Sequence, residues 1–312
     1  MIILSSQYAL ATTTAAPVNA AQWLEAMDSA LKTRTFQGTL VYVSSNRIET
    51  LKIFHSVVNG DEYEHIISLD EPIREIIRDR SKMFCFIKEQ RSGRESAVMS
   101  SKTWLGFPSE LKHANRYYTL QLGKQLSVME RPAQVIIIQP KDNFRYLRKV
   151  WIDLATMIPI KNQVLDSAGH VLEQLMFSTL SLDQSIPLTE FQLPNDSKSY
   201  QWVVQNTELI PQHQQRWSIA NKPAGFQVVK YMRYQSHVNA EQMTHILLSD
   251  GVSWVSVYID LDTETNEANS ETYTIGAINL ETSMSHGHRL TVLGEVPEQT
   301  IQAILDGIQL IQ

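Results

Sequence analysis

The sequence predicts an α+β protein built mainly from antiparallel strands and divided into two domains. Three observations support this. Long stretches alternate apolar and polar side chains, helical spacing is concentrated near the two ends, and an aperiodic segment with two prolines interrupts the pattern. At 312 residues the chain is too long for one small core, and 43% apolar with 19% charged residues is an ordinary globular balance.

The first predicted element is an amphipathic helix over residues 20–33. Asn19 is a suitable N-cap, and four apolar side chains follow at helical spacing: Trp23, Leu24, Met27 and Leu31. These side chains need an apolar cover, so the helix is expected to pack on a sheet.

An antiparallel meander follows the helix. In "IETLKIFHSVV" alternate residues form two faces, one with Leu51, Ile53, His55 and Val57 and the other with Thr50, Lys52, Phe54 and Ser56. The runs "DEYEHIISLD", "IREIIRDR" and "KMFCFIKE" repeat this pattern with short polar connections. Residues 100–123 predict a loop or helical excursion before strands resume at "RPAQVIIIQP". Residues 146–182 supply the last hairpins of this domain, which spans residues 19–183.

A linker is predicted at residues 184–205, because Pro187 and Pro194 lie there in a stretch with little periodicity. The second domain, residues 206–312, contains "GFQVVKYMRY", "HILLSDGVSWVSVYID" and "HRLTVLGEV" as strands. After Pro297 a terminal helix presents one apolar face, formed by Ile301, Ile304, Leu305 and Ile308.

Residues 1–18 are interpreted as the remnant of a signal peptide. Ala9-Leu10-Ala11 fits the small-x-small cleavage pattern, although no basic n-region precedes it and the apolar part is short. The alternative is an ordinary frayed N-terminus. The pattern favours export.

The composition and the motifs exclude several function classes. A net charge of -6 argues against a broad nucleic-acid surface, since binding to phosphates needs a basic footprint. No P-loop, dinucleotide glycine fingerprint, nucleophile elbow or HExxH spacing occurs, so we expect neither an enzyme nor a cofactor. His55, on an apolar strand face, is interpreted as a core histidine, and the single cysteine, Cys85, as a small core residue.

No metal site is expected. His286 and His288 could share an ion only with further ligands that the sequence does not identify, and a polar turn is the better interpretation. The stretch "DLDTETNEANSE" spaces its acidic residues like an EF-hand loop, but Thr265 stands where the sharp turn requires glycine and a strand precedes it. We interpret it as an acidic hairpin loop.

One basic stretch, "IREIIRDRSK", is a candidate docking surface for anionic groups. If a single strand covers it, four cationic side chains project to one face: Arg74, Arg78, Arg80 and Lys82. A turn near residues 79–81 would destroy this parity, and the alternative is a solvated sheet face.

Residues 146–182 also carry a family resemblance. They contain Trp151, Asp153, Thr156 and Pro159, then Asp166, Gly169, Glu173 and Phe177. This is similar to the "WxDxxTxLPxR…DxxGxxxExxxF" pattern of LolA-like lipoprotein-binding folds and of the RseB/MucB family, with mild departures at Ile158 and Lys161. The polar turn residues explain part of the pattern.

The second domain favours the RseB/MucB family over a LolA-type carrier, which would stop near residue 190. Trp217, Gly225-Phe226, Ser249-Asp250-Gly251 and "LTVLGEVPEQTIQAI" resemble the C-terminal domain of that family. The resemblance implies a LolA-like first domain, a curved antiparallel sheet forming an incomplete barrel, with the 20–33 helix on its concave side, and a smaller C-terminal α+β domain.

The resemblance also implies a function. Members are periplasmic negative regulators of an envelope-stress sigma factor: they bind the periplasmic domain of an RseA/MucA-type anti-sigma factor and shield it from proteolysis, and lipid, lipopolysaccharide or lipoprotein signals relieve that protection. A periplasmic lipid or lipoprotein carrier is the alternative. The sequence leaves open whether the chain forms a homo-oligomer.

A lipid cavity is expected in the N-terminal domain. Its candidate lining is apolar and comes from the strand runs: Phe54, Ile66, Ile76, Phe84 and Phe86. Strand parity alone does not say which face of the sheet is concave.

Overall fold

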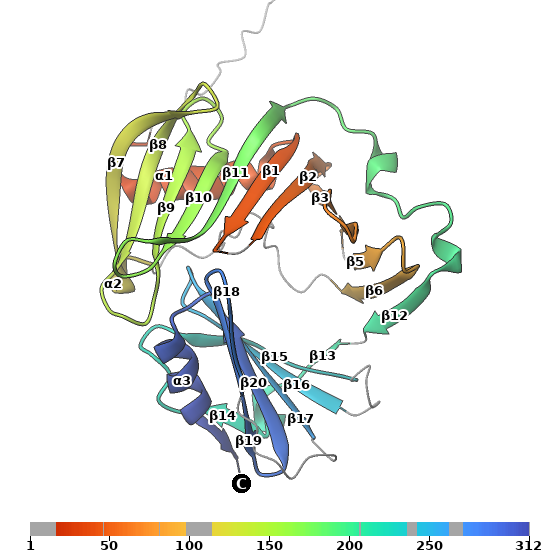
Figure 1. Ribbon diagram of the computed structural model, residues 1–312, viewed down its shortest axis with the longest axis vertical. Helices are drawn as coiled ribbons and strands as arrows, with labels where there is room; N and C mark the ends of the chain where they lie inside the picture. The colour runs from red at the N-terminus through yellow and green to blue at the C-terminus, as the bar shows by residue number, and fades with distance from the viewer. Residues whose placement is uncertain are drawn as a thin grey trace, which may run out of the picture.

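The computed structural model describes residues 17–45, 47–80, 82–97, 114–205, 207–235, 242–261 and 271–311. Figure 1 shows two units, a large curved sheet with a helix across it and a smaller sheet below. We call residues 17–205 the first unit and residues 207–311 the second unit. The predicted signal-peptide remnant lies almost wholly outside the described residues, as does most of the acidic loop at residues 260–271. No helix in the described part of the chain is long and apolar enough to cross a membrane.

Among the described residues, twelve strands form the sheet of the first unit, in the order β12-β6-β5-β4-β3-β2-β1-β11-β10-β9-β8-β7. Their bounds are β1 Phe36–Ser44, β2 Arg47–Val58, β3 Asp61–Ser68, β4 Arg74–Asp79, β5 Lys82–Ile87, β6 Ser92–Ala97, β7 Tyr118–Val128, β8 Arg131–Pro140, β9 Leu147–Asp153, β10 Pro159–Leu165, β11 Val171–Leu182 and β12 Gln201–Gln205. The central pair β1–β11 joins two antiparallel meanders, and only β12 runs parallel to its neighbour, β6. The sheet curves strongly but does not close, since β12 and β7 are its two edges (Figure 1).

Helix α1, Ala20–Thr33, is the predicted first helix. The Asn19 side chain accepts the Gln22 N–H at 3.0 Å, as an N-cap does. The apolar face of α1 is buried with sheet residues such as Leu40 and Ile53, both at most 1% exposed. The prediction that this helix packs on the sheet is confirmed.

The turn chemistry of residues 146–182 is also confirmed. The Asp153 carboxylate accepts the N–H groups of Ala155 and Thr156 and the Thr156 hydroxyl, which fixes the turn between β9 and β10. Gly169 has φ +89 in the next turn, a conformation that glycine adopts without strain.

The excursion predicted at residues 100–123 is partly wrong. Residues 98–113 lie outside the described residues, a short helix α2 covers Ala114–Tyr117, and β7 already begins at Tyr118. Strand β7 is an edge of the sheet, and most of its side chains are exposed, including Leu122 and Leu126 at 47% and 49%. An edge strand has too little buried surface to show a clear alternation.

The second unit is mostly β structure. In its described part, seven strands form an antiparallel sheet in the order β13-β15-β16-β17-β20-β19-β18, and β14 pairs with β21. The bounds are β13 Thr207–Leu209, β14 Trp217–Ile219, β15 Gln227–Gln235, β16 Gln242–Ser249, β17 Trp254–Leu261, β18 Thr272–Ile275, β19 Ile278–Ser285, β20 His288–Gly294, α3 Glu298–Asp306 and β21 Ile308–Leu310. Helix α3 covers one face of this sheet and buries Ile301 and Ile304 in its core.

The α+β class is therefore too helical a description of the chain. Strands dominate both units, and α1 and α3 are the long helices among the described residues. The prediction that the terminal helix extends to Ile308 is wrong. Ile308 is buried with Ile304, but it belongs to strand β21. Gly307 is the C-cap of the helix, and a Cβ at this position would collide with the Ala220 carbonyl oxygen.

The predicted linker is not a free tether. Its short helices η2, Leu188–Phe191, and η3, Ser197–Ser199, run along the outside of the first sheet, and its last five residues are β12. We call residues 184–200 the strap. Ile186 and Phe191 of the strap are buried on Phe54 and Tyr63. A domain boundary in this segment stays a prediction, but the strap itself packs as part of the first unit.

Candidate functional site: a cavity between two sheets

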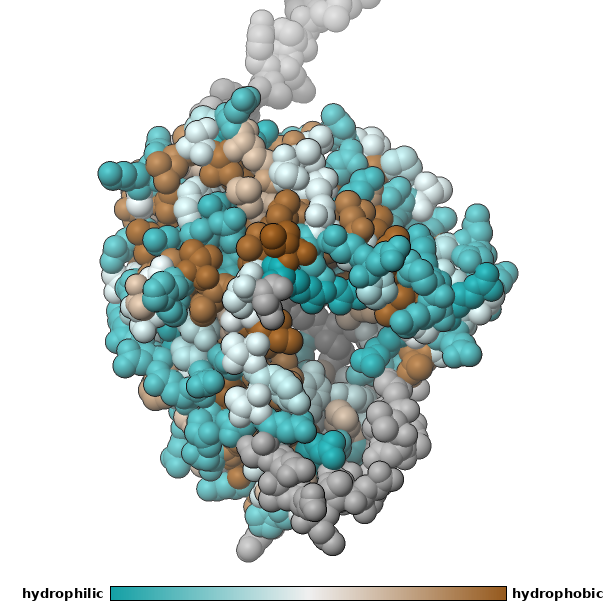
Figure 2. Space-filling view, in the orientation of Figure 1, coloured by the Kyte–Doolittle hydropathy of each residue, from teal (hydrophilic) through white to brown (hydrophobic). Residues whose placement is uncertain are grey.

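A cavity of about 1130 Å³ lies on the concave face of the first sheet, at its β2–β6 end. It is bordered on the other side by the second unit, through Trp254, Ile275, Ile278 and Glu295. Figure 2 shows this face of the molecule hollowed at its centre, between the two units. The volume is slightly above the range typical of small-molecule sites.

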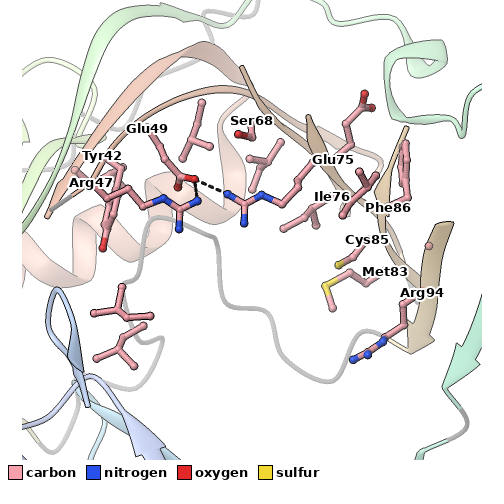
Figure 3. A pocket seen from close by; sticks show the side chains of 18 of the residues that line it. Tyr42, Arg47, Glu49, Ser68, Glu75, Ile76, Met83, Cys85, Phe86 and Arg94 are labelled. Carbon is pink, nitrogen blue, oxygen red and sulfur yellow. Dashed lines mark hydrogen bonds and ion pairs between the residues drawn. The ribbon is translucent and has the colours of Figure 1, made fainter. Parts of the chain in front are cut away.

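The apolar wall of the cavity follows from strand register. Ile66, Ile76 and Cys85 stand side by side on β3, β4 and β5, and directly paired residues share a face. Met83 lies on the same face of β5 as Cys85, two residues away. Figure 3 shows Met83 and Cys85 of β5 and Arg94 of β6 turned toward the cavity.

A charged group forms another part of the wall. The buried Glu49 carboxylate pairs with both Arg47 and Arg74 (Figure 3). Arg94 of β6 also lines the cavity. Toward the second unit the lining becomes acidic, with Glu173 and Glu295. Such a mixed wall suits a ligand that has an apolar body and a polar end.

Two of the five predicted cavity residues have their side chains on the cavity face. Ile66 and Ile76 line the cavity. Phe86 borders it, but its ring lies 5.9 Å from the ring of Tyr200 and 6.0 Å from that of Trp202, centroid to centroid. In Figure 3 the Phe86 ring lies on the other side of the strand from Met83.

The assignment of Phe54 and Phe84 to the cavity wall is therefore wrong, whereas Phe86 borders the cavity with its ring packed on the opposite side of the strand. Phe54 is buried under the strap with Ile186 and Phe191, and Phe84 packs edge-on against Trp202. The predicted lining combined residues of both parities, because both faces of these strands are apolar. Choosing the parity of Met83 and Cys85 on β5 would have found the cavity face.

The four predicted docking cations do not form one surface. The chain turns between β4 and β5, so the parity argument fails. Each side chain pairs with a separate carboxylate of its own sheet: Arg74 with Glu49, Arg78 with Glu62 at 2.9 Å and Glu64 at 3.6 Å, Arg80 with Asp61 at 3.0 Å, and Lys82 with Glu95 at 2.6 Å. Only Arg74 lines the cavity.

Arg47, Glu49 and Arg94 line the cavity but were not predicted from the sequence. Arg47 and Glu49 occupy alternate positions at the start of β2, so a polar alternation continues the apolar one on the same face. This signal was available, but its meaning depended on knowing which face is concave.

The candidate metal histidines serve the packing of the second unit. His286 and His288 lie against the Trp217 ring, with centroids 6.4 and 5.1 Å away. In the described part of the chain, no three His, Cys, Asp or Glu side chains are grouped to hold a metal ion.

His55 is a buried core residue, as interpreted. It is fully buried, stacks on Phe36 and bonds through Nδ1 to the Arg34 carbonyl at 2.9 Å. Burial lowers the pKa of His55 to about 4, opposed by the Arg34 carbonyl and reinforced by the positive charge of Arg78.

The two units meet at a buried ion pair. Arg145, between β8 and β9, and Asp250, between β16 and β17, both have fully buried side chains and bond directly. The Arg145 guanidinium lies over the rings of Tyr117, Tyr118 and Phe226 at 4.9, 5.6 and 5.0 Å, and the Tyr118 hydroxyl donates to Asp250 at 2.8 Å. Separating the units would leave both charges without this pairing.

A second set of contacts joins the units beside the cavity. Arg148 of β9, 1% exposed, donates to Glu295 at 2.7 Å, and the Asn279 amide donates to the Tyr146 hydroxyl at 2.9 Å. Glu173 of β11 accepts the Ala277 N–H at 2.8 Å. The junction is therefore polar, buried and continuous with the cavity wall.

An open curved sheet whose concave face encloses a cavity together with a second β unit defines a two-unit binding protein. Comparison with known families identifies which one. The model of the MucB/RseB N-terminal domain matches residues 19–196, and the model of the MucB/RseB C-terminal domain matches residues 211–309. The chain belongs to the MucB/RseB family.

Individual relatives align with this chain over nearly its full length. The sigma factor AlgU regulatory protein MucB of Pseudomonas aeruginosa is 24% identical over 308 residues, which cover 97% of this chain and 94% of that protein. The sigma-E factor regulatory protein RseB of Haemophilus influenzae is 24% identical over 299 residues, 94% of this chain and 91% of that protein. The fold is similar to the crystal structure of MucB in complex with MucA(peri), with a TM-score of 0.74 at 22% identity over 94% of this chain and 100% of that one.

Proposed function

We propose that this protein is a periplasmic negative regulator of an envelope-stress sigma factor. It binds the periplasmic domain of an RseA/MucA-type anti-sigma factor and shields that segment from proteolysis. The observation that carries the proposal is the match of both family domains in order over residues 19–309. The names of the relatives, sigma factor regulatory proteins, and the MucB structure solved with MucA(peri) support the same partner class.

The decisive measurement is binding of the anti-sigma periplasmic segment. Calorimetric titration of the full chain with that segment, taken from the same genome, should give a saturable complex. The bound segment should also resist a periplasmic protease that cuts it when it is free. Absence of both binding and protection would remove the proposal.

We also propose that the cavity receives the lipid part of the signal that relieves protection. The support is the chemistry of the cavity wall. Its apolar side chains, Ile66, Ile76 and Met83, suit an acyl chain. Its cationic side chains, Arg47, Arg74 and Arg94, suit an anionic head. Lipopolysaccharide has both an acyl chain and an anionic head, whereas lipoprotein acyl groups match the apolar part of the wall.

The single cysteine provides a probe for cavity occupancy. Cys85 lies in the cavity wall, and burial raises the pKa of its thiol, so labelling is best followed at mildly alkaline pH. Dodecanoate, below its micelle concentration, should slow alkylation of Cys85, and Met83→Asp should abolish the effect. An unchanged labelling rate with saturating dodecanoate would show that the chain does not occupy this cavity.

The cavity also favours the alternative function, a lipid or lipoprotein carrier. A carrier must move its cargo between membranes, whereas a regulator needs only to bind it. Transfer of labelled lipid from donor to acceptor vesicles, together with no binding of the anti-sigma segment, would favour the carrier. We do not expect enzymatic activity, because the proposed role is binding.

Whether the chain forms a homo-oligomer can be measured directly. Light scattering of the purified chain, with and without the anti-sigma segment, would show whether copies associate and whether the segment changes that state.

Binding of the anti-sigma segment is proposed to depend chiefly on the second unit and its junction with the first. Because the junction buries Arg145 and Asp250, this is best tested in the full chain and not with separated units. Exposed second-unit substitutions such as Tyr273→Ala should weaken the anti-sigma complex, whereas Met83→Asp in the cavity should leave it intact. The opposite pattern would contradict this division of roles.

A further inference from the structure

The turn between β18 and β19 reaches from the second unit to the cavity of the first. Ile275 and Ile278 flank this turn, pair with each other and both line the cavity. Ala277 within the turn is fully buried, whereas Ile275 is 54% exposed. The tip of the hairpin, residues 275–278, is therefore both a contact between the units and a part of the cavity wall.

Glu173 of β11 is the residue that receives this tip. Its Oε1 accepts the Ala277 N–H at 2.8 Å. Gly276, at φ +61, has no room for a Cβ, and the three atoms that such a Cβ would meet first all belong to Glu173. Tyr42 donates its hydroxyl to the same carboxylate, so the side chain is fixed from the sheet as well.

The Glu173 carboxylate is subject to opposing electrostatic effects. Burial raises the pKa of Glu173, and the nearby Glu295 carboxylate raises it further, while the Ala277 N–H and the Tyr42 hydroxyl act in the opposite direction. Arg148, which is paired with Glu295, also lowers it. Burying a charge costs free energy unless its partners compensate for it, so this contact depends on how well the Glu173 carboxylate is solvated.

The hairpin that carries the tip also forms one edge of the second sheet. Strand β18 has four residues, all exposed, and β19 is its one neighbour in the described sheet. Elements with few buried apolar contacts open with the lowest free energy.

We propose that Glu173 is a positioning residue that holds the hairpin tip of residues 275–278 against the first unit, and that this contact senses whether the cavity is occupied. The consequence for regulation rests on the proposed function. A ligand that packs on Ile275 and Ile278 also excludes water from Glu173 and Glu295, which lie in the same wall. Dehydration raises the cost of the Glu173 charge, so occupancy weakens the contact and releases the tip.

The direct reporter is hydrogen exchange of the Ala277 amide in the full-length chain. Glu173→Ala removes the acceptor, and Ala277 should exchange about fivefold to tenfold faster, as expected for one lost hydrogen bond. Glu173→Gln keeps an oxygen acceptor of the same shape and should preserve slow exchange. This conservative rescue separates the specific contact from a general loosening of β11.

Glycine substitutions provide a matched pair. Gly276→Ala places a Cβ against Glu173 and should free Ala277 as Glu173→Ala does. Gly287 also has positive φ, +72, in the adjacent β19–β20 turn, but nothing lies within 4 Å of its Cβ position. Gly287→Ala therefore imposes a similar backbone strain without the contact, and Ala277 should exchange as in the wild type.

The cavity is then filled with dodecanoate, and its entry is checked by slower labelling of Cys85. In the wild type, dodecanoate should accelerate exchange at Ala277, whereas in Glu173→Ala it should cause no further change. Wild-type exchange in Glu173→Ala would overturn the assignment of Glu173. Failure of dodecanoate to enter, or entry without a response at Ala277, would overturn the sensing role.

These outcomes are separable from failure of the proposed function. If the full chain does not bind the anti-sigma segment, the regulator assignment fails, but exchange at Ala277 still decides the role of Glu173. If the segment binds and Glu173→Ala releases it while Glu173→Gln does not, the hairpin contact is part of partner control. If all variants bind the anti-sigma segment with equal affinity, Glu173 acts at the cavity and has no role in partner binding.

Discussion

The two halves of the first sheet use the same concave face in different ways. Over much of β1 and β7–β11, and at Ile53 of β2, this face is filled by α1, and Met27 and Leu24 are fully buried there. Toward β3–β6 and β12 it is left open as the cavity, which also reaches the ends of β10 and β11, and there the convex face carries the packing, against the strap and Trp202. An apolar strand face therefore does not identify a core: in one half it is a core, and in the other it is a wall.

The largest expected effect comes from the convex side of the open half. Phe86 is 3% exposed and packs on Tyr200 and Trp202. Phe86→Ala should lower the free energy of unfolding by about 3–5 kcal/mol, through lost burial and the cavity it leaves. Urea denaturation measures this. A loss below about 1 kcal/mol would show that the strap does not form a true core.

A methionine pair tests the concave side directly. Met27 of α1 is fully buried, whereas Met83 lines the cavity and is half-buried. Met27→Ala should destabilise the chain by about 2–5 kcal/mol, and Met83→Ala by less than about 1 kcal/mol. Met83→Ala should instead weaken the effect of dodecanoate on Cys85 labelling. Similar denaturation midpoints for the two variants would contradict the contrast between the halves.

The pH dependence of stability should be set in part by His55, which is buried where the filled half meets β2. Its pKa is lowered to about 4, while a histidine in the unfolded chain titrates near ~6.5. As the pH falls through this window, only the unfolded state gains the proton, so the free energy of unfolding decreases by about 1–3 kcal/mol and then levels off.

His55→Asn should flatten that slope, because a neutral amide replaces the ring and does not titrate. His213→Asn is the control, since His213 is exposed on the 3-10 helix η4, Gln212–Gln214, of the second unit. Urea titrations at several pH values between the two limits give the slope. An unchanged slope in His55→Asn would show that other groups, His245 among them, account for the acid sensitivity.

The smallest effect is expected at the outer turn of the open half. The Arg80–Asp61 pair is largely exposed, with side chains at 64% and 47%, and such pairs contribute little after solvent screening. Arg80→Ala should change neither the melting temperature nor the affinity for the anti-sigma segment. A clear loss of affinity with unchanged stability would restore Arg80 as a docking residue.

Much of the architecture followed from the sequence because it depends on neighbours along the chain. Helix α1 was predicted with its bounds and its cap, since Asn19 and the spacing of Trp23 to Leu31 are local signals. The turns at Asp153 and Gly169 were equally local. Strand β7 was missed, because an exposed edge carries no periodic apolar signal.

The tertiary structure decided which face of the strands matters and what joins the two units. Alternation specifies that Phe86 and Met83 point to opposite sides, but not which side the strap will cover and which will remain a cavity, because both sides are apolar. Arg145 and Asp250, or Glu173 and Ala277, are each about a hundred residues apart, and no local pattern relates them. Their pairing exists only because the second unit docks on the first, a long-range contact whose geometry is fixed by the packing of whole sheets.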